Sequence, residues 1–280
     1  MAQTLYPPEH VLSIGEVLDL SFRIFRVSLL KCLPLAVAAL LLAQLPNIYS
    51  VLHGGSLAGV LLGEHDSVWW VLYVVGWLLS TALWGAVLVR QHAVISGQGG
   101  TAMDAIGVGL RRLAGMIAIG VIIVLAIGVC LVPAGLLMGN RLAMGLAILV
   151  LLVPASYVML RLSCASTAYL INRWGIFESV QRSWTLTEGA FWRLAVIYTV
   201  ALFVLIVFYF LAATVAGAVA VPLGFGDVAI VTAVTTSIVV ILGAFATPFF
   251  TAIALAVFGD LSARREGADL AARISGPATP

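Results

Sequence analysis

Charged residues are scarce in this sequence. Asp, Glu, Lys and Arg together make up only 9% of its 280 residues, whereas 62% are hydrophobic. Soluble domains carry about 25% charged residues, so a chain of this composition cannot cover a water-facing surface. The net charge of +2 is too small to indicate a nucleic-acid partner. The composition therefore predicts an all-α integral membrane protein whose main solvent is lipid.

The sequence also lacks the patterns that metal, cofactor and nucleophile chemistry require. Its three cysteines, Cys32, Cys130 and Cys164, show no CxxC spacing and lie in or beside apolar runs. Neither a zinc site nor a disulfide framework is therefore indicated. No P-loop, dinucleotide-binding fingerprint or nucleophile–His–acid set is present. We therefore expect no catalytic residue, no bound metal and no cofactor, and we do not expect an enzyme.

One loop holds a group of potential metal ligands, namely Glu64, His65 and Asp66, with His53 upstream. Adjacent residues on a flexible loop rarely converge on one ion, and no second His motif supports them. We interpret this segment as a solvated acidic loop.

Long apolar runs are what the sequence has in abundance. Six of them lie roughly at residues 27–52, 68–95, 113–138, 142–171, 190–221 and 228–258. Each meets the requirement of about 20 residues for a helix that crosses a bilayer. The fourth and sixth runs are long enough to need a tilt or a kink, and Pro154 and Pro248 are natural kink sites. No cleavable signal peptide opens the chain, so we expect the first span to remain in the protein.

The basic residues predict the orientation of these spans. If the N-terminus is cytoplasmic, every one of the 14 Lys and Arg residues except Arg141 falls on or near the cytoplasmic side. This is a strong positive-inside bias. With six spans, both termini are predicted to be cytoplasmic.

Three helix-start signals precede pairs of spans. They are Ser13 with Glu16, Thr101 with Asp104, and Gly175 with Glu178. In such a capping box the two residues hydrogen-bond the free backbone N–H groups of the first turn. Hydrophobic and charged residues alternate at helical spacing after each signal, which predicts three cytoplasmic interfacial amphipathic helices.

The three signals also indicate a threefold repeat of an interfacial helix and a transmembrane hairpin. The predicted units lie roughly at 11–95, 101–171 and 175–258 within a single membrane domain, 1–280. A cytoplasmic tail, 259–280, continues the last helix, and Gly267 is a natural place for that helix to end. The alternative is that amphipathic helices beside spans look alike whatever their ancestry.

The most polar segment between two apolar runs is 175–193, and it directs the choice of candidate site residues. The lipid-headgroup or docking candidates are Arg161, Glu178, Arg182, Trp184, Arg193, Arg111 and Arg112. Arg161 lies inside the fourth run, where an ionisable group favours a functional role. We expect it to reach the inner interface or to pair with Glu178 or Glu16; contact with a lipid phosphate is the alternative. Ordinary positive-inside flanking would also account for the other arginines.

Three stretches, 13–26, 178–193 and 260–270, resemble the bacterial family named for the membrane domain of glycerophosphoryl diester phosphodiesterases. The resemblance implies an integral protein of the bacterial inner membrane. In some relatives such a domain is joined to a catalytic barrel of about 250 residues. The tail after the last span cannot hold a barrel, so we do not expect hydrolase activity here.

These observations favour a non-catalytic protein that contacts anionic membrane lipids, either as a scaffold or as an accessory subunit of a membrane complex. A membrane or cytosolic protein would then be its partner. The alternative is a transporter of lipids or small molecules, with a cavity between the hairpins near Gln44, Asn47 and Arg161. The sequence alone does not decide between these two functions.

Overall fold

The computed structural model describes residues 6–8, 10–53, 65–135, 141–223 and 228–275, and all of its regular structure is α-helical; no strand occurs in this part of the chain. Six helical stretches are long and apolar enough to cross a membrane, as predicted. They are Ile14–Ala43, Ser67–Ile95, Leu113–Pro133, Ala143–Asn172, Phe191–Pro222 and Ser237–Arg265. The chain therefore has the architecture of a multi-pass, all-α membrane protein.

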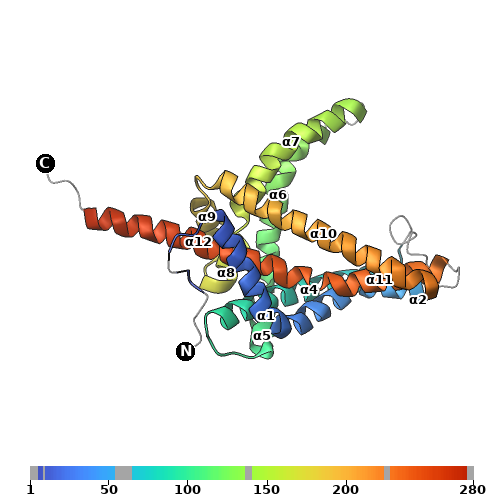
Figure 1. Cartoon of the computed structure of the whole chain (residues 1–280). Helices are drawn as coiled ribbons and strands as arrows, with labels where there is room; N and C mark the ends of the chain where they lie inside the picture. Colours follow the sequence, from blue (N-terminus) through green and yellow to red (C-terminus); the bar gives the residue numbers. More distant parts are fainter. Residues whose placement is uncertain (1–5, 9, 54–64, 136–140, 224–227, 276–280) are drawn as a thin grey trace. The chain divides into compact units, whose positions relative to one another are not determined.

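Figure 1 labels the helices in chain order. Their bounds are α1 Ile14–Ala43, α2 Leu45–Leu52, α4 Ser67–Ile95, α5 Ala102–Arg111, α6 Leu113–Gly135, α7 Arg141–Leu162, α8 Ala165–Asn172, α9 Ile176–Leu186, α10 Phe191–Leu223, α11 Val228–Gly243 and α12 Ala246–Ser275.

The chain forms two compact units, each made of separate segments. Unit 1 contains Met1–Ser21, Ala114–Thr199 and Ile253–Pro280, and unit 2 contains Phe22–Leu113 and Val200–Ala252. The boundaries of the three predicted repeats stay a prediction.

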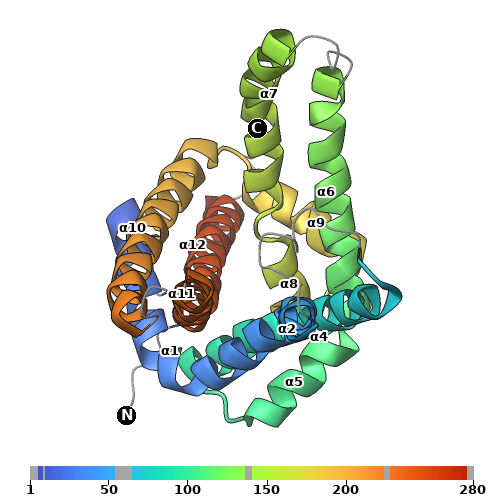
Figure 2. The ribbon, with the colours of Figure 1, turned by 90° about the vertical axis from the view of Figure 1, so that its right-hand side faces the viewer.

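In unit 2, glycines allow helices to approach α4 very closely. A Cβ atom at Gly76 of α4 would collide with the carbonyl oxygen of Leu42, and one at Gly109 of α5 would collide with that of Ala82. Close approach through small residues is the usual way in which helices pack in a membrane. Figure 2 shows α5 lying against α4, as this contact requires. The buried core beside them consists of Cys32, Leu35, Ala36, Ala86, Val87, Ala105 and Ala244.

In unit 1, α9 packs against α8 and the end of α7. Helices α6 and α7 expose large apolar side chains along their length, among them Val124, Val129, Leu149 and Val150. Apolar groups so exposed suit hydrocarbon and not water.

Several predicted helix boundaries need correction. The first amphipathic segment and the first apolar run form one helix, α1, which ends at Ala43, before the end of that run. Helix α7 continues through Pro154 and ends at Leu162. The sixth run is divided between α11 and α12, and Pro248 lies in the first turn of α12, where its missing N–H removes no helical hydrogen bond.

The predicted helix end at Gly267 is also wrong, because α12 continues to Ser275. A single glycine costs a helix only about 1 kcal/mol relative to alanine. The neighbouring Ala, Leu, Arg and Glu residues favour the helix enough to continue through it.

Two of the three helix-start pairs make both of the predicted hydrogen bonds. Thr101 N–H donates to Asp104 at 2.7 Å, and Asp104 N–H donates to the Thr101 hydroxyl at 3.2 Å. These bonds, first that of the Thr101 backbone, hold the pKa of Asp104 below its ordinary value. Ser13 and Glu16 form the same reciprocal pair, at 2.6 and 3.3 Å.

At α9 the cap is only half complete. Gly175 N–H donates to Glu178 at 3.3 Å, but glycine has no side chain to return the bond.

Candidate functional site

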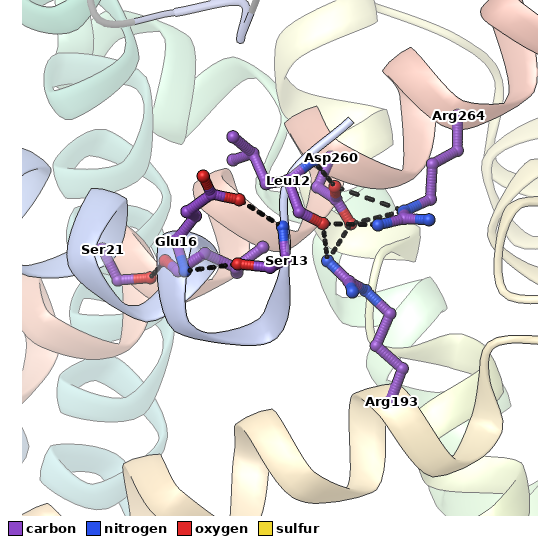
Figure 3. A network of polar contacts seen from close by, with 8 residues as sticks. Leu12, Ser13, Glu16, Ser21, Arg193, Asp260 and Arg264 are labelled. Carbon is purple, nitrogen blue, oxygen red and sulfur yellow. Dashed lines mark hydrogen bonds and ion pairs between the residues drawn. The ribbon is translucent and has the colours of Figure 1, made fainter. Parts of the chain in front are cut away.

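A buried carboxylate, Asp260 of α12, joins three segments of unit 1 (Figure 3). The backbone N–H of Leu12 donates to Asp260 Oδ1 at 2.9 Å, and Arg193 Nη2 donates to Asp260 Oδ2 at 2.8 Å. Arg264 Nε, one turn further along α12, donates to both carboxylate oxygens, at 3.3 and 3.1 Å. We call these four residues, Leu12, Arg193, Asp260 and Arg264, the Asp260 clasp.

The clasp also binds the carbonyl of Leu12. Arg193 Nη2 donates to this oxygen at 2.7 Å, and Arg264 Nη2 donates to it as well. Both backbone groups of Leu12 are therefore satisfied by side chains from α10 and α12. Leu12 directly precedes Ser13, the cap of α1, so the clasp fixes the point at which the first helix begins.

The electrostatics of the clasp explain its burial. The Asp260 side chain is only 1% exposed, whereas Arg193 is 18% and Arg264 37% exposed. A buried carboxylate is stable when it is paired and hydrogen-bonded, and here it accepts from two guanidinium groups and one amide. Arg193, predicted to contact lipid, is therefore engaged in holding unit 1 together.

A second polar junction fixes α9 to the end of α7. The hydroxyls of Ser183 and Thr187, one turn apart near the end of α9, donate to the backbone carbonyl of Arg161 at 2.8 and 3.1 Å. This carbonyl lies in the last turn of α7, where helical carbonyls lack an intrahelical partner. The two hydroxyls therefore complete the end of α7 and hold α9 against it.

The side chain of Arg161 has no acidic partner among the residues that the structure describes. Its guanidinium carbon lies 4.5 Å from the ring centroid of Trp184 and 5.8 Å from that of Tyr157. Arg161 is only 6% exposed, and its Nε atom is buried without a hydrogen-bond partner. Among the described residues Arg161 forms no ion pair with Glu178 or Glu16, so the structure does not show the predicted pairing; that Arg161 reaches the inner interface stays a prediction.

Arg182 repeats this arrangement on α9. Its guanidinium carbon lies 5.5 Å from the ring centroid of Trp174, and its Nε atom is buried without a partner. Glu178, one turn earlier, accepts from Gly175 at the start of α9. The cations of Arg161 and Arg182 are thus held by tryptophan rings and not by carboxylates of the described residues.

Large aromatic side chains are exposed around α9. Phe177 is 81% exposed and Trp192, at the start of α10, is 79% exposed, while Trp184 is half-exposed. A group of large exposed rings is unusual on a surface that faces water. At a membrane interface, in contrast, aromatic side chains are enriched.

The remaining candidates, Arg111 and Arg112, end α5 in unit 2. Arg111 is exposed, and the backbone N–H of Arg112 donates to the carbonyl of Val108 at 3.0 Å. Thr101 and Asp104 cap the opposite end of the same short helix. Helix α5 thus carries its acid at its start and its arginine at its end, as the helix dipole favours.

Gln91 of α4 is a buried polar group that the sequence analysis did not single out. It is fully buried in unit 2, and its Nε2 donates to Ser28 Oγ and to the Pro248 carbonyl, both at 2.9 Å. Its Oε1 accepts from Thr251 Oγ1 at 2.6 Å. An amide near the end of an otherwise apolar span is the signal that could have identified it.

The polar groups of the first run and its loop bond locally. Gln44 Oε1 accepts from Asn47 Nδ2 at 2.6 Å. Asp66 accepts from the Tyr49 hydroxyl at 2.7 Å and from Trp69 N–H at 2.9 Å, and these bonds hold its pKa below its ordinary value. His65 stacks on Trp69, whereas Glu64 lies outside the described residues.

Comparison with family models, with curated proteins and with solved structures finds no match to this chain. The candidate site therefore rests on its own geometry.

Proposed function

We propose that this chain is a non-catalytic protein of the bacterial inner membrane that contacts anionic lipid headgroups, with both termini in the cytoplasm. It acts as a lipid-contacting scaffold or as an accessory subunit of a membrane complex. The observation that carries the proposal is a pair of arginines in unit 1, Arg161 of α7 and Arg182 of α9, each of which lies over a tryptophan ring and forms no ion pair with a described carboxylate.

The side chains around α9 support placing this helix at the level of the lipid headgroups. The exposed rings of Phe177, Trp184 and Trp192 would enter the interface between headgroups and acyl chains, where aromatic side chains concentrate. Basic side chains beside them would meet lipid phosphates, which attract each arginine with about 1 kcal/mol near an anionic surface. Helix α9 then lies on the membrane as an interfacial helix.

Helix α5 supports the same placement for unit 2. It exposes Met103 and Leu110 together with Arg111, and its capping box makes it a well-defined short helix. A short helix with exposed apolar and basic side chains is typical of a segment lying in the interface. The second and third interfacial helices of the proposed repeat are then α5 and α9, and the first is the beginning of α1.

Lipid enrichment tests the proposal. The full chain would be reconstituted in nanodiscs that contain phosphatidylcholine and a minority of phosphatidylglycerol, and the lipids retained on extraction would be quantified by mass spectrometry. We expect enrichment of phosphatidylglycerol that falls as salt is added. The variant Arg182→Gln should lower the enrichment by about fivefold, which corresponds to the loss of about 1 kcal/mol.

The matched control is Arg182→Lys, which keeps the charge and should retain most of the enrichment. Equal retention of both lipids by the wild-type chain would contradict the proposal. Lipid transfer between the two leaflets of proteoliposomes, dependent on this chain, would contradict the scaffold function and favour a transporter. A protein that co-purifies in a fixed ratio would favour the accessory-subunit form.

A further inference from the structure

The guanidinium of Arg161 is a buried cation without a counter-ion in the described part of the chain. It makes no hydrogen bond to a described residue, and its Nε is buried and unpartnered. An arginine cannot lose its proton in a protein, so its charge persists wherever it is buried. A charge in apolar surroundings is costly unless a partner neutralises it.

Of the acids of unit 1 whose side chains the structure describes, three bind other groups, and the remaining two, Asp19 and Glu188, are exposed and form no ion pair with Arg161. Asp260 binds Arg193, Arg264 and Leu12, while Glu178 and Glu16 accept from the backbone at the starts of their own helices. The counter-charge of Arg161 must therefore come from outside these residues.

The position of Arg161 along α7 indicates what that counter-charge is. Helix α7 begins at Arg141, and the 1.5 Å rise per residue puts Arg161 about 30 Å further along the axis. This length equals the hydrocarbon thickness of a bilayer, about 30 Å. An α7 that spans the membrane therefore brings Arg161 to the level of the lipid phosphates.

The surface next to Arg161 suits the other parts of a phospholipid, namely the oxygens of its headgroup and its acyl chains. The guanidinium rests on Trp184 and Tyr157, whose rings are themselves partly exposed. Stacking on a ring face leaves the edge of the guanidinium, with its N–H groups, for an oxyanion. Val153 of the same helix, about two turns before Arg161, is well exposed and apolar, as contact with acyl chains requires.

We infer that Arg161, whose guanidinium lies over the rings of Trp184 and Tyr157, binds a single phosphate group, that of one anionic phospholipid held at a fixed place on this protein. The inference rests on the proposed function and sharpens it, because general attraction at a charged surface involves many exchanging lipids whereas this site holds one. The Arg161 guanidinium binds the phosphate, and the Trp184 ring holds the guanidinium in one orientation.

Native mass spectrometry of the detergent-solubilised full chain, titrated with phosphatidylglycerol, tests the site. The wild-type chain should retain one lipid per chain through conditions that remove the others. Arg161→Gln should weaken this one-to-one complex by about tenfold or more, the effect expected from losing a charge-assisted hydrogen-bonding partner. Trp184→Leu should weaken it less, and Arg161→Lys should bind between the wild type and the glutamine variant.

The matched control is Arg265→Gln, which removes an exposed arginine of the same unit and should leave the one-to-one complex within about twofold of the wild type. Ser183 and Thr187 bind the carbonyl of Arg161 and not its side chain, so the anchor of α9 survives in every Arg161 variant. If Arg161→Gln nevertheless fails to fold, the lysine and Trp184 variants carry the test.

Two further measurements are needed. One distinguishes a lipid phosphate from free phosphate, and the other distinguishes failure of the Arg161 site from failure of the proposed function. Inorganic phosphate in large excess should not displace the lipid; displacement would overturn the lipid assignment in favour of free phosphate. A one-to-one complex that persists in all Arg161 and Trp184 variants would overturn the site, while general enrichment in nanodiscs could still support the proposed function. If nanodiscs with the wild-type chain show no enrichment of phosphatidylglycerol, the proposed function itself is overturned.

Discussion

Replacing Asp260 with alanine should open the Asp260 clasp and release the start of α1. The substitution removes the carboxylate that accepts from Leu12, Arg193 and Arg264. Because Leu12 and Asp260 are both buried, the groups left behind cannot all regain water.

The magnitude follows from the burial of each partner. The buried N–H of Leu12 loses its acceptor, which costs about 1–3 kcal/mol. Removing one member of a fully buried ion pair costs about 3–5 kcal/mol. Arg193 and Arg264 are 18% and 37% exposed, so water would compensate much of their loss. We therefore expect Asp260→Ala to destabilise the protein by about 3 kcal/mol in all.

Three comparisons isolate the clasp from general effects of the substitution. Asp260→Asn keeps an oxygen for Leu12 and loses the charge, and it should cost about 1–2 kcal/mol. Asp19→Ala removes an exposed acid of the same unit and should change stability by no more than about 0.5 kcal/mol. In the Asp260→Ala background, a further Arg193→Gln substitution should cost less than it does alone, because the partner is already gone.

The assay combines a global and a local measurement on the protein in nanodiscs. Thermal unfolding, followed by tryptophan fluorescence, should rank the proteins in the order Asp260→Ala, Asp260→Asn and wild type, from least to most stable. Hydrogen exchange at the Leu12 amide should accelerate by about a hundredfold in Asp260→Ala, as the loss of about 3 kcal/mol of local protection implies. Unchanged exchange at Leu12 in this variant, with unchanged unfolding, would refute the reasoning.

Three further predictions concern unit 2. Gly109→Ala should destabilise the protein by about 1–3 kcal/mol in thermal unfolding, because its methyl group would meet the carbonyl of Ala82, whereas Gly107→Ala, with open space, should not. Gln91→Leu should cost about 1–2 kcal/mol, since hydrogen bonds between membrane helices average about 0.6 kcal/mol each. Asp104 has a lowered pKa, so its cap stabilises α5 above about pH 4 and is lost as the pH falls through that lowered value. Amide exchange at the start of α5, corrected for intrinsic rates, should show this loss in the wild type and not in Asp104→Asn.

Features that depend on neighbouring residues in the chain were predictable. The number of candidate spans follows from apolar length, and the bonds of Thr101 with Asp104 and of Ser13 with Glu16 follow from a spacing of three residues. Both signals act within one or a few helical turns, so no knowledge of the tertiary structure is needed.

Helix boundaries were predicted less well because single-residue rules are weak. Pro154 and Gly267 lie inside continuous helices, although each residue often marks a kink or an end. The break between α7 and α8 instead follows Leu162, where Ser183 and Thr187 from α9 satisfy the freed carbonyl of Arg161. A helix can end where other side chains replace its missing partners, and those side chains are not visible in the local sequence.

The candidate site was only partly predictable for the same reason. Arg161, Arg182 and Arg193 look alike in the sequence, since each is a basic residue beside or within an apolar run. Only the fold shows that Arg193 meets Asp260, 67 residues further along the chain, while Arg161 and Arg182 meet tryptophan rings. The positive-inside pattern therefore mixes two kinds of arginine, those that hold the protein together and those whose charge is still available to a ligand. A search for lipid sites in such proteins should begin with the second kind, because a buried guanidinium that no nearby carboxylate neutralises leaves a charge for an anionic ligand to neutralise.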